Sequence, residues 1–142
     1  MDDYKPIIGV VVSTYNENIT ARLRQGALET LAAGGYGESR VEVVSVPGAW
    51  EIPLAAQRLA QRDDVAGVVC LGAVIRGETS HDEHINRAVS SALMQLMLQF
   101  QKPIGFGLLT CHTMEQAIHR AGGNVGNKGV ETASAVLSML GP

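Results

Sequence analysis

Two hydroxyls and a histidine follow a glycine in the segment 77–81, which reads Gly-Glu-Thr-Ser-His. Exposed backbone N–H groups at the start of a helix, aided by the helix dipole, favour a bound anion, so this segment is a candidate phosphate site. Thr79 and Ser80 could equally do no more than cap the helix. His81 suits proton exchange with a bound ligand, because the unperturbed pKa of histidine lies near neutrality. A lone histidine in a first helical turn is otherwise more often a surface residue.

The pair His81 and His84, with Asp82 and Glu83 between them, raises the alternative of a metal site. A spacing of three puts both imidazoles on roughly one helix face. However, the stretch is not HExxH and no third ligand is evident, so we expect no metal. Glu83 is better explained as a partner of a nearby imidazole or as an acidic residue at a helix start.

Arg120 and Lys128 flank a glycine-rich kink in the segment 120–129. The segment lacks the order GK[ST] and follows a predicted helix, so it is not a loop for nucleoside triphosphates. Two cations beside a kink can clamp an anion. A solvent-exposed helix corner is the more common role of such residues.

Two aromatic side chains come directly after predicted strands. Tyr15 precedes Asn16, and Trp50, the only tryptophan, lies between Ala49 and Glu51. The two rings could form a wall for a planar heterocycle, with Asn16 and Glu51 offering polar groups. Packing of both rings in a contact between subunits is an equal alternative.

The candidate site residues must be held in place by regular structure. Four short, β-branched apolar runs are candidates for it, at 7–13, 41–46, 65–74 and 103–110. Both faces of each run are apolar, which is typical of buried strands in a parallel sheet. Apolar residues at helical spacing fill 19–31, ended by Gly34 and Gly35, and 85–100. Thr113 and Gln116 predict a capping box for a helix through Ala121, and a last helix runs to about Leu140.

The predicted order is βαβαβαβαα. Strands that alternate with helices indicate an α/β protein, here a single three-layer α/β/α domain over 1–142 with a four-stranded parallel sheet. Ligands of such sheets bind at the carboxyl ends of the strands. The residues singled out above follow those ends, so the predicted fold gathers them at one edge.

Composition excludes several classes of function. The 142 residues carry a net charge of −3 without a Lys/Arg cluster, which argues against nucleic acid. No apolar run is long enough for a bilayer, and the first residues do not resemble a signal peptide, so we expect a cytoplasmic protein that binds no membrane. Cys70 and Cys111 lie in apolar runs and are expected to be reduced and structural.

Four separated motifs occur in one order along the chain: VPGAWEIP at 46–53, LGAVIRGET at 71–79 followed by His81, EQAI at 115–118, and RAG at 120–122 with GNKG at 126–129. In this order and spacing they resemble the lumazine synthase family, whose fold is flavodoxin-like. The resemblance extends from Ile8 to about Leu140. Several ordered motifs are far more specific than a lone glycine pattern.

The resemblance implies roles for residues already singled out. Tyr15 would stack on a pyrimidine with Asn16 beside it, and His81 would be the catalytic proton donor. The other implied contacts are Ala49, Trp50 and Glu51 with a ribityl chain, Ala73, Val74 and Ile75 with the uracil, Glu78, Thr79 and Arg120 with a sugar phosphate, and Phe106, Arg120 and Lys128 as residues contributed by a neighbouring subunit.

The implied activity is the penultimate step of riboflavin biosynthesis. 5-Amino-6-(D-ribitylamino)uracil condenses with 3,4-dihydroxy-2-butanone 4-phosphate, and phosphate and water leave. The steps are Schiff-base formation, phosphate elimination and ring closure, and none needs a metal, redox cofactor or covalent enzyme intermediate. They need proximity of two small-molecule substrates and a proton shuttle.

The resemblance also implies a homopentamer, with an icosahedral 60-subunit shell of twelve pentamers and an association with riboflavin synthase left open. Three departures bear on this. Tyr15 and Trp50 stand where the family usually has phenylalanine, and Asp82 stands where an aromatic is expected. The N-terminal segment is also too short for most of the extra strand that many relatives place on an adjacent subunit. A carboxylate beside His81 favours a charged imidazole.

Two rival functions compete with this one. A catalytically weak, ligand-binding or shell-forming relative would keep the fold and the aromatic wall, but His81, Arg120 and Lys128 argue against it. A flavodoxin-like regulatory module with a phosphoacceptor aspartate fails, because no acidic cluster ends the first or third predicted strand.

Overall fold

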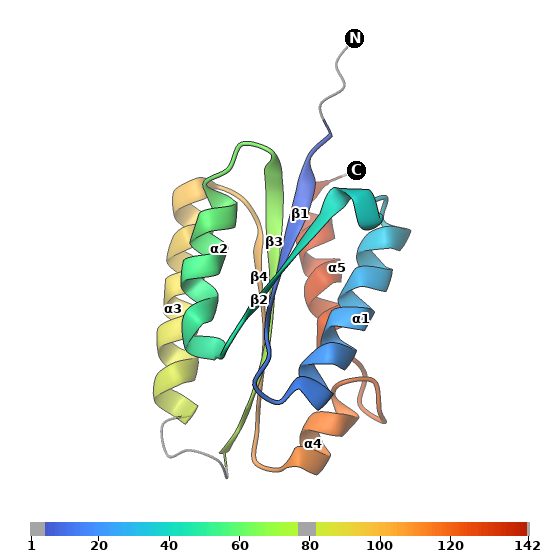
Figure 1. The fold of residues 1–142 in the computed structure, drawn as a ribbon, viewed down its shortest axis with the longest axis vertical. Coiled ribbons are helices and arrows are strands. Elements are labelled where there is room, and N and C mark those ends of the chain that lie inside the picture. The colour runs from blue at the N-terminus through green and yellow to red at the C-terminus, as the bar shows by residue number, and fades with distance from the viewer. Residues whose placement is uncertain (1–4, 77–81, 142) are drawn as a thin grey trace.

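A central sheet lies between two layers of helices (Figure 1). In the computed structural model, which describes residues 5–76 and 82–141, the strands lie in the order β2-β1-β3-β4 and every pairing is parallel. The strands are β1 (Ile7–Ser13), β2 (Val41–Val46), β3 (Val65–Ile75) and β4 (Ile104–Cys111). The predicted four-stranded parallel sheet is confirmed. β1 and β2 have the predicted bounds, whereas β3 ends one residue later and β4 both begins and ends one residue later.

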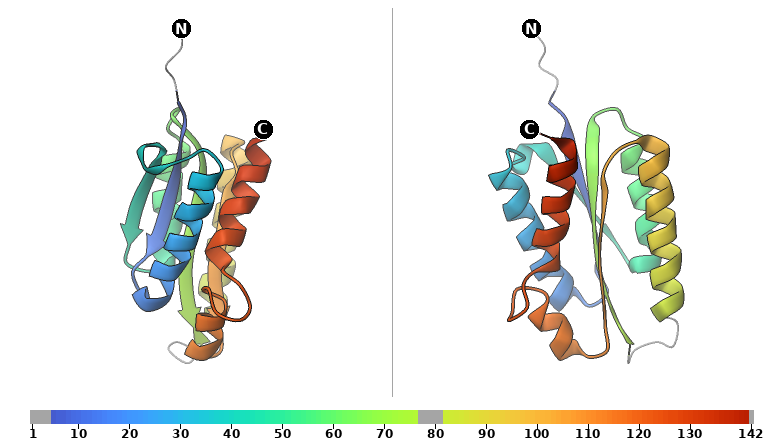
Figure 2. Two further views of the ribbon diagram at one scale, coloured as in Figure 1. Left: turned by 90° about the vertical axis from the view of Figure 1, so that its right-hand side faces the viewer. Right: turned by 180° about the vertical axis from the view of Figure 1, so that it is seen from behind.

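Helices cover both faces of the sheet. One face carries α1 (Glu17–Ala33) and α5 (Lys128–Leu140), and the other carries α2 (Ile52–Ala60) and α3 (Asp82–Phe100). The short helix α4 (Met114–His119) follows the carboxyl end of β4, and η1 (Glu38–Arg40) and η2 (Ala49–Glu51) are single turns. This three-layer, flavodoxin-like α/β arrangement is the predicted one. The view from behind in Figure 2 shows the same two layers.

The core consists of two apolar clusters, one on each face of the sheet. Alternate side chains of β1 enter different clusters: Val10 and Val12 pack with α1, and Val11 packs with α2. All three are at most 4% exposed. Because both faces are covered, β1, β3 and β4 are apolar almost throughout rather than alternating in polarity, whereas the edge strand β2 also carries Glu42 and Ser45.

The start of α4 differs in detail from the predicted capping box. Thr113 Oγ1 accepts a hydrogen bond from Gln116 N (3.2 Å), but Gln116 Oε1 accepts from His112 N (2.9 Å) rather than from Thr113. The helix also ends at His119, before the predicted Ala121. Ala121 instead forms a bridge with Asn127, and this pairing takes the chain out of the helix.

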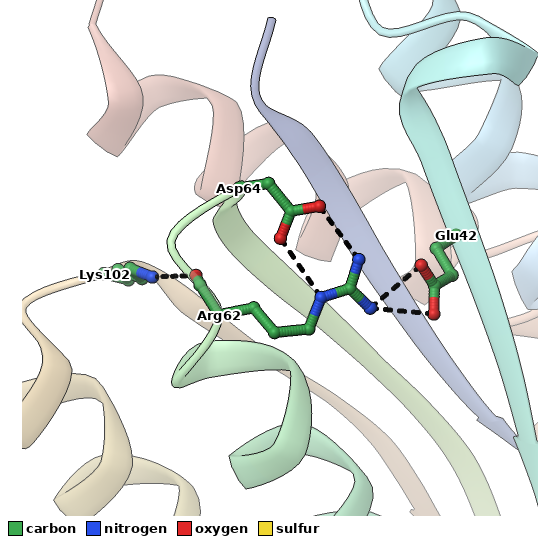
Figure 3. A network of polar contacts seen from close by, with 4 residues as sticks. All are labelled: Glu42, Arg62, Asp64 and Lys102. Atoms are coloured by element: carbon green, nitrogen blue, oxygen red, sulfur yellow. Dashed lines mark hydrogen bonds and ion pairs between the residues drawn. The ribbon is translucent and has the colours of Figure 1, made fainter. Parts of the chain in front are cut away.

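A network of polar contacts lies at the amino ends of β2, β3 and β4, which is the end of the sheet opposite to the carboxyl ends of the strands (Figure 3). The Arg62 guanidinium donates to both carboxylate oxygens of Glu42 in β2 and to both of Asp64, just before β3. Lys102 Nζ donates to the carbonyl oxygens of Ala60 (2.8 Å) and Arg62 (2.7 Å) at the end of α2. The network ties the edge strand β2 to the chain entering β3 and β4.

This network predicts a pH-dependent part of the stability. The hydrogen bonds from Arg62 hold the pKa of Asp64 below its ordinary value. A carboxyl with a lowered folded-state pKa stabilises the fold above its unfolded pKa, and this contribution disappears as the pH falls through the folded value. We therefore expect Asp64→Asn to lower the melting temperature more at pH 7 than at about pH 3, because protonation of Asp64 begins to remove its contribution below the ordinary carboxyl pKa. An equal loss at both pH values would contradict the role of the ion pair.

Both cysteines are free and buried. Burial raises the pKa of each thiol, and the charge of Arg120 partly opposes this at Cys111. Both thiols therefore stay protonated at neutral pH. None of the helices within residues 5–76 and 82–141 is long and apolar enough to cross a membrane.

Candidate active site

The chain segments after β1 and β2 are held together by backbone hydrogen bonds. Thr14 N donates to Val46 O (2.8 Å), and Tyr15 N donates to Pro47 O (3.0 Å). These bonds continue the parallel pairing beyond the last strand residues. As a result, Tyr15 and Trp50, which are 35 positions apart in the sequence, are brought to one end of the sheet.

Tyr15 and Trp50 border a hollow of about 170 Å³ at the carboxyl ends of β1 and β3. Both rings remain largely exposed, at 58% and 63% of their surface. Exposed aromatic rings beside an apolar hollow are suited to stacking on a planar ligand. Six of the predicted substrate-binding residues are brought together here: Tyr15, Ala49, Trp50, Ala73, Val74 and Ile75. Sequence reasoning missed two further lining residues, Gly48 and Ile85.

Asn16 lies beside this hollow in the left-handed backbone region, with φ 61° and ψ 48°. Its Nδ2 donates to Ala73 O (3.1 Å), so the side chain ties the start of α1 to the end of β3. Asparagine tolerates the left-handed region better than most residues, which helps the chain turn directly from β1 into α1. The contact of Asn16 with substrate stays a prediction.

Glu51 is not among the residues that line the hollow beside Trp50. Its Oε1 accepts a hydrogen bond from Gly48 N (2.9 Å), which closes the turn η2. The residue lines a different hollow, of about 450 Å³, between β2 and α2. One carboxylate oxygen thus stabilises the turn that carries Trp50. Binding of the ribityl chain by Glu51 stays a prediction.

The second hollow that gathers predicted site residues, of about 350 Å³, lies along β4. Phe106, Arg120 and Lys128 all line it, as the resemblance implies for residues that serve a common site. Thr110 Oγ1 donates to Asn86 Oδ1 (3.4 Å), which joins β4 to α3 at this hollow. The remaining lining residues were not predicted as site residues; they are Asn86, Leu108, Leu109, Thr110, Val125 and Glu131. Two of them had a usable signal: Thr110 ends a predicted strand, and Glu131 lies one helical turn after Lys128.

The two cations of this hollow are joined through their backbones. Lys128 N donates to Arg120 O (2.9 Å), and the bridge between Ala121 and Asn127 lies directly inside this bond. The glycine-rich kink is therefore a closed loop that brings the two cations to one hollow, although seven residues separate them in the sequence. Two positive side chains and the carboxylate of Glu131 give the hollow a net positive charge, which suits an anionic ligand.

Three predicted site residues, Glu78, Thr79 and His81, lie outside the described residues. The chain is described again from Asp82, the first residue of α3, which is only 6% exposed. Glu83 and His84 are exposed. Among residues 5–76 and 82–141, no group of three or more His, Cys, Asp or Glu side chains could hold a metal ion.

The hollow beside Tyr15 and Trp50 and the hollow along β4 share no lining residue. Tyr15 and Trp50 follow β1 and β2, whereas Phe106 belongs to β4, the strand at the opposite edge of the sheet. One hollow offers two exposed aromatic rings and backbone groups, and the other offers two cations beside the single ring of Phe106.

The fold and these hollows define an α/β protein that binds a small ligand at the carboxyl ends of a parallel sheet. Residues 5–141 match the family model of 6,7-dimethyl-8-ribityllumazine synthase. The chain therefore belongs to the 6,7-dimethyl-8-ribityllumazine synthase family, which confirms the resemblance found in its motifs.

Curated relatives agree with this family. The chain is 51% identical to the 6,7-dimethyl-8-ribityllumazine synthase of Rhodopirellula baltica, over 94% of this chain and 86% of the relative. It is 50% identical to the enzyme of that name from Thermus thermophilus and 44% identical to the one from Pediococcus pentosaceus, each over 94% of this chain and 85% of the relative.

Proposed function

We propose that this chain is a cofactor-independent transferase that makes 6,7-dimethyl-8-ribityllumazine. It condenses 5-amino-6-(D-ribitylamino)uracil with 3,4-dihydroxy-2-butanone 4-phosphate and releases phosphate and water. Membership of the family over residues 5–141 supports this activity. The observation that carries the proposal is the pair of complementary hollows, one aromatic and one cationic, lined by the residues that the family's motifs predicted.

The aromatic hollow is assigned to the aminouracil. Tyr15 and Trp50 offer ring faces, and the chain from Ala73 to Ile75 offers backbone groups to the ring edge. Holding the 5-amino group beside the ketone of the second substrate replaces a bimolecular encounter by an oriented one, which can account for much of the rate enhancement. The product of this step is a Schiff base, formed with loss of water.

The cationic hollow is assigned to the phosphate end of the second substrate. Arg120 binds the phosphate and stabilises the charge that develops as phosphate leaves, and Glu78 and Thr79, which follow β3 in the sequence, contact the sugar-phosphate substrate. Phe106 and Lys128 complete the aminouracil site. His81 transfers the proton that elimination and ring closure require. Each of these residue roles is a proposal.

We propose that a complete site is formed between two subunits, as the family resemblance implies. The separate linings of the aromatic and cationic hollows support this, because the two exposed rings and the two cations lie in different hollows. A head-to-tail contact between identical chains gives a closed ring when its rotation divides a full turn. We propose the homopentamer of the family as the minimal active unit. Assembly of pentamers into a 60-subunit shell and association with riboflavin synthase are secondary proposals that depend on it.

The activity is tested by mixing the purified protein with both substrates. We expect the absorbance of the lumazine to rise at a rate proportional to protein concentration, with phosphate released in equal amount. A rate no higher than that of the spontaneous condensation would reject the proposed function.

Arg120→Ala tests the phosphate assignment. A hydrogen bond to a charged group contributes roughly 1.5–3 kcal/mol, so we expect the KM of the sugar phosphate to rise about 10- to 100-fold. The KM of the aminouracil should change much less. Arg58→Ala is the matched control, because Arg58 lines the separate hollow between β2 and α2. A rise in the KM of the aminouracil alone would show that Arg120 is wrongly assigned.

A further inference from the structure

Helices α1 and α5 run side by side on one face of the sheet (Figure 2), and glycines permit their closest approach. A Cβ atom on Gly129, in the first turn of α5, would collide with the Leu23 carbonyl of α1. A Cβ atom on Gly26 would lie 2.7 Å from Asn127 Oδ1 and 2.8 Å from its Nδ2. The side-chain amide of Asn127 is thus packed directly on the backbone of α1.

The Asn127 side chain makes three hydrogen bonds at this crossing. Its Oδ1 accepts from Gly129 N (2.8 Å) and Val130 N (3.1 Å), which caps the amino end of α5. Its Nδ2 donates to Arg22 O (3.2 Å) in α1. A serine or an aspartate could provide the cap, but neither reproduces the amide donor that reaches α1. The identity of the residue therefore has a reason beyond helix capping.

The side of the first turn of α5 that faces away from α1 packs against β4. Thr132 Oγ1 donates to Lys128 O (2.7 Å). A Cβ atom on Gly105 or Gly107 would lie 2.5 or 2.7 Å from side-chain atoms of Thr132. The first turn of α5 is consequently held between α1 and the sheet, with Lys128 as its first residue.

We propose that Asn127 is a positioning residue of the active site: its amide anchors the start of α5 to α1 and so fixes where Lys128 meets the aminouracil. Lys128 directly follows Asn127 and is bonded to Arg120 through its backbone, so a shift of this turn moves the cationic side of the site. The inference rests on the proposed function, in which Lys128 contacts the aminouracil.

The test compares two serine variants of one loop. Asn127→Ser keeps a capping oxygen but loses the donor to Arg22 O, whereas Asn124→Ser alters an exposed residue for which no side-chain hydrogen bond is described within residues 5–76 and 82–141. We expect Asn127→Ser to raise the KM of the aminouracil about 3- to 10-fold with little change in kcat, and Asn124→Ser to leave both unchanged. Asn127→Asp, which keeps the shape and the cap, should behave like Asn127→Ser.

A double-mutant cycle separates positioning from general destabilisation. If Asn127 acts through Lys128, Asn127→Ser should raise the KM no further once Lys128 is alanine. Additive effects of the two substitutions, or an unchanged KM in both Asn127 variants, would overturn the proposal. Hydrogen exchange over 128–132, measured by mass spectrometry, should accelerate in Asn127→Ser but not in Asn124→Ser.

Activity of the wild type distinguishes failure of the proposed function from failure of the positioning role of Asn127. A wild-type protein that forms no lumazine above the spontaneous rate would reject the proposed function, and the positioning role would fall with it. Wild-type activity together with normal KM values in the Asn127 variants would reject the positioning role alone.

Discussion

Replacing His81 by alanine is expected to lower the kcat of lumazine formation by about 10²- to 10⁴-fold, the usual contribution of a general acid or base. The aminouracil should still bind with nearly unchanged affinity, because its contacts are assigned to other residues. The measured loss lies toward the lower end of this range if the spontaneous condensation of these reactive substrates is fast, because the observed rate cannot fall below the uncatalysed rate. Stopped-flow absorbance at saturating concentrations of both substrates measures the effect.

His84→Ala is the matched control for this experiment. His84 is an exposed histidine in α3, three residues after His81 in the sequence, so its replacement removes the same chemical group without touching the proposed proton donor. Unchanged kcat in His81→Ala at saturation would remove His81 from the mechanism. An equal loss in both variants would point to the fold of this helix end rather than to proton transfer.

Mixed oligomers of two impaired variants are expected to regain activity if, as proposed, each hollow contributes half of a site shared between subunits. His81→Ala damages the half that carries Tyr15 and Trp50, and a variant with Arg120→Ala and Lys128→Ala damages the other half. In rings assembled at random from equal amounts, about one site in four combines two intact halves. We therefore expect the coexpressed, doubly tagged oligomer to show roughly a quarter of the wild-type rate.

The controls for complementation are each variant coexpressed with itself and the mass of each assembly from light scattering. Equal masses with activity restored only in the mixed rings would establish a site shared between subunits. Absence of restored activity in rings of the correct mass would place both halves within one chain. A fully active monomer would have the same consequence, and it would also remove the neighbouring-subunit roles given to Phe106, Arg120 and Lys128.

The strands were predictable because their physical signal is local. A parallel strand covered on both faces is apolar along its whole length, so Ile7–Ser13 could be delimited from composition alone. The edge strand Val41–Val46 was recognisable from its four valines, despite Glu42 and Ser45. The end of α4 was less predictable. The pairing of Ala121 with Asn127 stops the helix at His119, and nothing in the preceding residues signals that pairing.

By itself, the sequence determined the α/β class, the bounds of most elements, the family, and which residue types stand at the carboxyl ends of the strands. These properties depend on composition and short-range spacing. Only the tertiary structure decided how the candidate residues are divided between two hollows, because the strand order β2-β1-β3-β4 differs from the order along the chain. Only it also placed the Asn127 amide on Arg22, 105 positions away, since a contact between helices leaves no periodic signal in the sequence.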